Sequence, residues 1–220
     1  MSKIAQDLVT LFRGSVDDSV APYLWSDIEV LAYIDEAQIA FARDTEIFFD
    51  SVTPGLTSIP IAVGAGLVSL DSRVLKVRRA KLASQDAPLT VLNFDELDSS
   101  WDWEKATGTP ASLILDVTNK KGQLIPSSQV ADMLNIWVYR DPLKSVSTLT
   151  DVLEVDDPLD MRLGLLNYVK NVAYDKNDSD IHNEQLSKLY AAKFDEYTLK
   201  AKYKFQKQRR QPGFIRYGGL

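Results

Sequence analysis

A long amphipathic helix, predicted over residues 25–50, constrains this chain more than any other stretch. Ser26 and Glu29 have the spacing of a capping box, in which each side chain binds the other residue's backbone N–H at a helix start. Side chains then recur every three or four positions on one helix face: Val30, Ile34, Ala37, Phe41, Thr45 and Phe48, with Leu31 and Phe49 beside them. Burying such a face contributes on the order of 10 kcal/mol, so the helix requires a partner surface.

Three isoleucines of the same stretch lie off this face, near its charged side. They are Ile28, Ile39 and Ile47. One interpretation is that they contact neighbouring loops of their own domain. The other is that a second subunit covers them, so that the helix is buried from two directions.

Composition narrows the classes of protein to consider. The chain has 220 residues, 45% of them hydrophobic, which is enough for a substantial core in one or two domains. It has no cysteine and one histidine, which excludes disulfides and thiolate metal sites and argues against zinc and triad chemistry. The N-terminus lacks a signal-peptide pattern, and no apolar run approaches the ~20 residues that span a bilayer. We therefore expect a soluble intracellular product without metal or cofactor.

The order of the predicted elements indicates an α+β fold. Helices are predicted over 3–12 (closed by Gly14), 25–50, 158–176 and from 186 onward, and strands over 56–63, 67–70, 74–83, 89–92, 112–117, 123–126 and 134–139. Separate runs of helices and strands favour α+β over alternating α/β. We expect a helical bundle from residues 1–53 and 150–208, an inserted antiparallel β-rich domain at 54–149, and a tail at 209–220.

The sequence motifs that could indicate a catalytic site are weak, and we expect that this protein is not an enzyme. Gly64 and Gly66 lack the third glycine and the crossover helix of a dinucleotide site. An acidic cluster is a minor candidate for glycoside hydrolysis and a better one for a solvated face: Asp95, Glu96, Asp98, Asp102 and Glu104. A second acidic run lacks the spacing of a calcium loop: Asp151, Glu154, Asp156 and Asp157. His182 is predicted at the surface.

The C-terminus has the opposite charge to the rest of the chain. From residue 200 there are seven basic residues and no acidic one, although the formal net charge of the chain is −6. The basic and aromatic residues of this end are Lys200, Lys202, Lys204, Phe205, Lys207, Arg209, Arg210, Phe214, Arg216 and Tyr217. Three interpretations stay open: cations that suit a helix end, docking onto an acidic protein groove, and a nucleic-acid-binding module that acts through this tail.

An ordered series of segments resembles the head-to-tail adaptor (connector) proteins of tailed bacteriophages. The series is W-S-D-x-E and I-D-E-A-Q in residues 25–38, F-D-E-L-D at 94–98 with Trp101, T-G-T-P at 107–110, L-I-L-D at 113–116, L-I-P at 124–126, L-N-I-W-V-Y-R at 134–140, and the closing helical pair. Together these segments cover roughly residues 25–200.

The resemblance implies a structural virion protein of the neck, assembled in the host cytoplasm. Members of the family are expected to form a ring, typically dodecameric, under the portal protein, to seal the DNA channel and to dock a tail or nozzle protein. The segment from Lys200 to Leu220 would engage the portal, and Ile28, Ile39 and Ile47 would contact neighbouring subunits. DNA would pass the acidic body without specific binding, because like charges repel.

Overall fold

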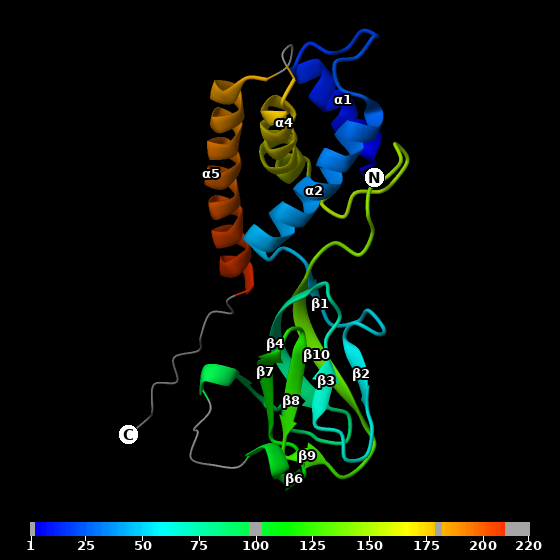
Figure 1. The fold of residues 1–220 in the computed structure, drawn as a ribbon, viewed down its shortest axis with the longest axis vertical. Coiled ribbons are helices and arrows are strands. Elements are labelled where there is room, and N and C mark those ends of the chain that lie inside the picture. Colours follow the sequence, from blue (N-terminus) through cyan, green and yellow to red (C-terminus); the bar gives the residue numbers. More distant parts are fainter. Residues whose placement is uncertain (1–2, 97–102, 179–181, 210–220) are drawn as a thin grey trace, which may run out of the picture. The chain divides into compact units, whose positions relative to one another are not determined.

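The structure, a computed structural model, describes residues 3–96, 103–178 and 182–209. Its residues group into two compact units, Met1–Ile47 with Pro142–Leu220, and Phe48–Asp141. The first unit is helical and the second is built of strands (Figure 1). The C-terminal helices pack against the long N-terminal helix, so the predicted α+β class, with helices at both ends of the chain and a β-rich insertion, is confirmed.

The helical unit contains α1, α2, α4 and α5 and two short helical segments. The elements are α1 (Ala5–Ser15), α2 (Asp27–Thr45), α3 (Pro158–Asp160), the π-helical turn η3 (Met161–Leu165), α4 (Leu166–Asp175) and α5 (Glu184–Arg209). Gly14 lies inside the last turn of α1 and does not close it, because Val16 is the C-cap. Among the described helices, none is both long and apolar enough to cross a membrane.

Helix α2 begins as predicted and ends earlier than predicted. Ser26 is the N-cap and forms the capping box with Glu29. The helix stops at Thr45 because Glu46 takes a left-handed conformation, with φ 54°. Phe48 and Phe49 therefore do not extend the apolar face of α2. Phe49 belongs instead to strand β1 of the second unit.

The helix predicted over 158–176 is interrupted near its start. Asp157 caps α3 by accepting backbone N–H bonds from Leu159 and Asp160. A π-helical turn follows and carries Gly164. A Cβ atom on Gly164 would lie 2.7 Å from the buried ring of Phe41, so glycine permits the close approach of this turn to α2.

Aromatic contacts join the helices of this unit. The indole of Trp25 packs edge-on against Phe12 of α1, with ring centroids 5.3 Å apart, and against Tyr174 of α4 at 5.9 Å. The ring of Phe41 in α2 stacks on Tyr197 of α5 at 6.3 Å. The predicted apolar face of α2 thus forms part of the core, from Val30 to Thr45.

In its described residues, 48–96 and 103–141, the second unit contains ten strands in three sheets. They are β1 (Phe49–Asp50), β2 (Ser58–Ile61), β3 (Leu67–Ser69), β4 (Val74–Leu82), β5 (Thr90–Asn93), β6 (Thr107–Gly108), β7 (Ser112–Thr118), β8 (Lys121–Ile125), β9 (Ser127–Ser128) and β10 (Asp132–Arg140), with 3-10 turns η1 (Phe94–Glu96) and η2 (Trp103–Lys105).

Strand β10 organises the first sheet. It pairs antiparallel with β4 over most of its length and with β1 and β2 at different positions. The second sheet has the order β3-β8-β7-β5, and β6 pairs with β9 alone. The block is mixed and not purely antiparallel, since β5 runs parallel to β7 and β6 parallel to β9.

Candidate docking surfaces

The segment that joins α1 to α2 exposes apolar side chains. Val20 and Ile28 are 78% and 81% exposed, and Tyr23 and Leu24 are also exposed. We name these four exposed residues, Val20, Tyr23, Leu24 and Ile28, the loop flank. Exposed apolar clusters of this kind typically mark contact surfaces.

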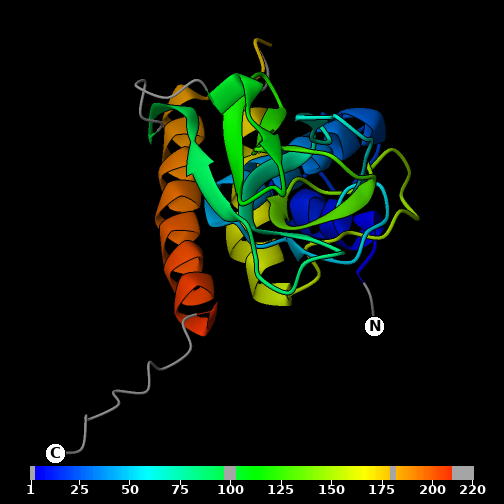
Figure 2. The same cartoon turned by 90° about the horizontal axis from the view of Figure 1, so that it is seen from below.

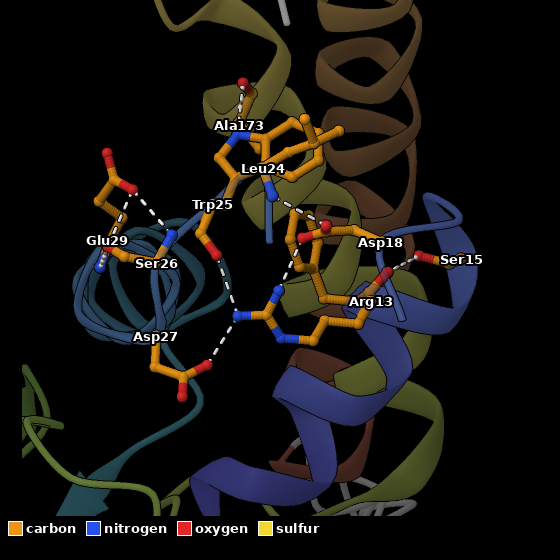
Figure 3. Close-up of polar contacts among 10 residues, drawn as sticks. Arg13, Ser15, Asp18, Leu24, Trp25, Ser26, Asp27, Glu29 and Ala173 are labelled. Atoms are coloured by element: carbon orange, nitrogen blue, oxygen red, sulfur yellow. Dashed lines mark hydrogen bonds and ion pairs between the residues drawn. The ribbon is translucent and has the colours of Figure 1, made fainter. Parts of the chain in front are cut away.

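Arg13 of α1 holds this segment in a defined conformation (Figure 3). Its guanidinium donates to Asp18 Oδ2 at 2.6 Å, to the carbonyl oxygen of Trp25 at 2.9 Å and to Asp27 Oδ1 at 2.7 Å. It also lies 3.6 Å from the ring centroid of Tyr23. Arg13 and Asp18 are both buried, so each charge depends on the other for compensation. The loop flank is therefore an ordered surface.

The start of α2 is fixed to α4 by two further contacts. The indole Nε1 of the buried Trp25 donates to the carbonyl oxygen of Ala173 at 3.2 Å (Figure 3). Lys176 donates to Glu29 Oε1 at 2.6 Å, and this bond, with the backbone N–H of Ser26, lowers the pKa of Glu29 to about 2. The capping box thus also positions the loop flank against the helical core.

The three isoleucines predicted as subunit contacts differ in their surroundings. Ile28 is exposed, whereas Ile39 and Ile47 are half-buried. Ile28 and Ile39 are eleven residues apart in α2, close to three full turns, so they share a side of the helix about 16 Å apart. Ile47 follows the end of α2 and lies outside the helix.

Helix α5 supplies a second candidate surface. Its inner face, which includes the buried Phe194 and Ala201, packs against the rest of the helical unit. On its outer side Leu199 and Tyr203 are 69% and 68% exposed, one turn apart, and Leu189 is exposed nearer the start. We name these three residues the α5 flank. In Figures 1 and 2 α5 lies on one side of the helical unit and α1 on the other, with α4 between them.

The basic end of α5 is partly described. Lys200, Lys204 and Lys207 are exposed, and Lys202 and Phe205 are half-buried. Lys200 pairs with Glu196, the last acidic residue of the chain, and Lys204 lies 5.6 Å from the ring centroid of Phe205. Arg209 ends the helix. Arg210, Phe214, Arg216 and Tyr217 lie outside the described residues.

The acidic clusters bind the protein's own backbone. Asp151 accepts from the backbone N–H groups of Ser147 and Thr148, and Glu154 accepts from that of Leu143. Glu96 accepts from the backbone N–H of Asn93. Asp98 and Asp102 lie outside the described residues, as does Trp101. Within the described ranges, no three acidic or histidine side chains are placed to hold a metal ion.

Sequence reasoning identified Ile28 but missed the other members of the loop flank and the whole α5 flank. Val20, Tyr23 and Leu24 lie between the predicted helices 3–12 and 25–50, in a stretch for which no element was predicted. Leu199 and Tyr203 lie opposite the apolar face of α5, and a helical projection of residues 184–209 places them there. That projection was the available signal. Val20, Tyr23 and Leu24 offered none, because the order of their segment depends on Arg13.

The family model described as SU10 adaptor protein matches residues 4–216, which is nearly the whole chain. A search of curated proteins finds no match.

Proposed function

The chain belongs to the SU10 adaptor protein family, a family of phage head-to-tail adaptors, and from this premise we propose that copies of it form a ring under the portal protein. The family is structural and not catalytic. In our proposal the ring seals the DNA channel in the virion neck and presents a docking surface to a tail or nozzle protein. Twelve copies is the stoichiometry that the family resemblance suggests.

Ring closure is supported by the two flanks of the helical unit. A ring needs a head-to-tail interface, in which two different surfaces of the same subunit meet. The loop flank and the α5 flank are both apolar, both exposed and separated by α4. In the proposed ring, Leu199 and Tyr203 of one copy contact Tyr23, Leu24 and Ile28 of the next. Ile39 and Ile47 extend the same interface.

The observation that supports portal docking is the positive charge of the last turns of α5. Beyond Glu196 every charged residue is basic, and Lys200, Lys204 and Lys207 are exposed on a helix whose other side is packed. Such an end is suited to an acidic groove, with α5 as a rigid support for the residues that follow it. We assign portal contact to this segment: Lys200, Lys202, Lys204, Phe205, Lys207, Arg209, Arg210, Phe214, Arg216 and Tyr217.

The excess of acidic residues elsewhere fits a channel component. With 31 acidic residues in the chain, an inner ring surface with acidic character repels phosphates. DNA then slides through without a stable contact. In this proposal the basic segment binds the portal, and the acidic remainder of the chain repels DNA.

Neutralising the basic segment tests portal docking. The variant Lys204→Gln/Lys207→Gln/Arg209→Gln/Arg210→Gln retains helix-forming residues and should bind the cognate portal at least tenfold more weakly, measured by biolayer interferometry. The control Lys188→Gln removes an exposed cation that forms the same kind of pair, with Glu184, as Lys200 forms with Glu196. It should bind normally.

Two results would contradict this assignment. Unchanged portal binding by the neutralised variant would exclude the basic segment as the contact. Loss of tight, salt-dependent binding to a DNA duplex, with portal binding intact, would instead favour the nucleic-acid-binding module.

A further inference from the structure

The strand-built unit has a hollow on one face of its β4–β10 sheet that the adaptor role described above does not use. Its volume is about 520 Å³. It is lined by Phe49, Arg78, Arg79, Pro88, Leu89, Val91 and Trp137. Two arginines and two exposed or half-buried aromatic side chains thus surround one depression, with an apolar rim along Pro88, Leu89 and Val91.

A β-bulge gives this face both arginines. Along β10 the pairing shifts, so that Trp137 faces Arg79 and the next residue, Val138, faces Val77. Arg78 is the extra residue of β4 at this point. In regular pairing, consecutive side chains point to opposite faces of a sheet. Here Arg78 and Arg79 are both exposed and both reach aromatic rings at the hollow.

The guanidinium groups are held in place by these rings. The Cζ atom of Arg78 lies 5.8 Å from the ring centroid of Phe49, and Arg78 Nη1 donates to the hydroxyl of Tyr139 at 3.2 Å. The Cζ atom of Arg79 lies 5.0 Å from the ring centroid of Trp137. Within the described part of the chain, no carboxylate lines the hollow or pairs with either arginine. Two exposed cations at the hollow therefore have no carboxylate partner among the residues that the structure describes.

We propose that this hollow docks an acidic segment of a partner protein in which an apolar side chain stands beside carboxylates. Guanidinium groups bind carboxylates through paired N–H bonds. The apolar rim accepts the neighbouring side chain. Arginine, tryptophan and tyrosine are also the residues that carry most binding energy at protein interfaces. This surface is independent of the helical unit and stands whether or not the ring and portal assignments do.

Single-stranded nucleic acid fits the hollow less well. Bases bind such proteins by stacking on open aromatic faces. Here Arg79 lies against Trp137, and Phe49 is packed against both Arg78 and Tyr139, with centroids of Phe49 and Tyr139 5.5 Å apart. The aromatic faces are thus partly occupied by the guanidinium groups, and N–H donors and aliphatic carbons line the rest of the hollow.

Binding of a defined peptide to the full chain tests the proposal. The probe is a fluorescein-labelled peptide of sequence DEFDELDEF, compared with its neutral counterpart NQFNQLNQF and with an oligothymidylate of equal length, all by fluorescence anisotropy. The acidic peptide should bind with micromolar affinity, and the neutral peptide at least tenfold more weakly. Arg79→Gln should weaken binding of the acidic peptide about tenfold, because half of the cationic pair is lost.

The controls separate docking from folding and from portal binding. Lys188→Gln, on α5 of the other unit, should leave peptide affinity unchanged. Arg79→Gln should leave the melting temperature and portal binding unchanged, so a negative peptide result says nothing about the ring. Absence of acidic-peptide binding, equal affinity for the neutral peptide, an unaffected Arg79→Gln variant, or tighter binding of the oligothymidylate would each overturn the proposal.

Discussion

The hydroxyl of Tyr197 on α5 donates a hydrogen bond of 2.6 Å to Oδ1 of Asp160 at the end of α3. Asp160 is buried, and that burial raises its pKa above the usual value. Burial and this hydrogen bond also raise the pKa of Tyr197. The contact ties the middle of α5 to the end of α3, directly before the π-helical turn.

Tyr197→Phe and Asp160→Asn should therefore respond differently to pH. A carboxyl whose pKa is raised by folding contributes most stability below its unfolded pKa and loses that contribution as pH rises through the folded value. Asp160→Asn keeps an acceptor without the buried charge, so its stability relative to the wild type should be higher at pH 7 than at pH 3. Tyr197→Phe should lose about 1–2 kcal/mol at pH 7. Urea denaturation at both pH values measures this, and a pH-independent difference for Asp160→Asn would contradict it.

The Glu29–Lys176 pair should have the opposite pH dependence. Its hydrogen bonds lower the pKa of Glu29 to about 2, so its contribution is present above the unfolded pKa and is lost as pH falls through the folded value. Both side chains are about one-third exposed, and we expect Lys176→Met to lose roughly 1 kcal/mol at pH 7. In urea denaturation the loss should be much smaller at pH 2, close to the folded pKa of Glu29, than at pH 7. An equal loss at both pH values would show that the aliphatic chain of Lys176 matters more than its charge.

Removal of Arg13 should disorder the loop flank. Arg13→Met leaves the buried Asp18 without its cation, and breaking such a pair typically costs about 3–5 kcal/mol. Limited proteolysis should then cleave between residues 16 and 25, where we expect the wild type to resist cleavage. Asp17→Asn is the matched control, because Asp17 is exposed beside the network, and it should be cleaved no faster than the wild type. Equal resistance of Arg13→Met would mean that other contacts order the loop.

Two glycine substitutions should change stability in opposite directions. Gly164→Ala places a methyl group against the buried ring of Phe41 and should lose about 1–3 kcal/mol. Gly14→Ala meets nothing within 4 Å inside α1 and should gain about 0.5–1 kcal/mol, since alanine favours helix. Thermal unfolding of both variants measures the pair. A neutral Gly164→Ala would show that Phe41 and Tyr197 can move apart.

Local sequence signals predicted the helix starts and the strand core well. The capping box of Ser26 and Glu29 involves neighbours in the chain, and the spacing of Phe194, Tyr197 and Ala201 reports one helix face directly. These features need no information from distant residues. The same holds for β10, where β-prone side chains form a continuous run.

The features that sequence reasoning missed depend on contacts between distant residues. The end of α2 is set by the left-handed Glu46 and by pairing of Phe49 with Tyr139 of β10. The order of the loop flank depends on Arg13 reaching Asp27 across the connection. The docking hollow depends on a bulge in β4, which no pattern in residues 74–82 reveals.

Head-to-tail contact between copies is the central claim, and cysteine cross-linking tests it most directly. The chain has no cysteine, so Leu24→Cys on the loop flank and Tyr203→Cys on the α5 flank can be joined selectively by a short bis-maleimide. On portal, the double variant should give a ladder of covalent oligomers, and the two single variants should give only dimers when mixed and none alone. Dimers from either single variant alone, or no ladder from the double variant, would contradict the account.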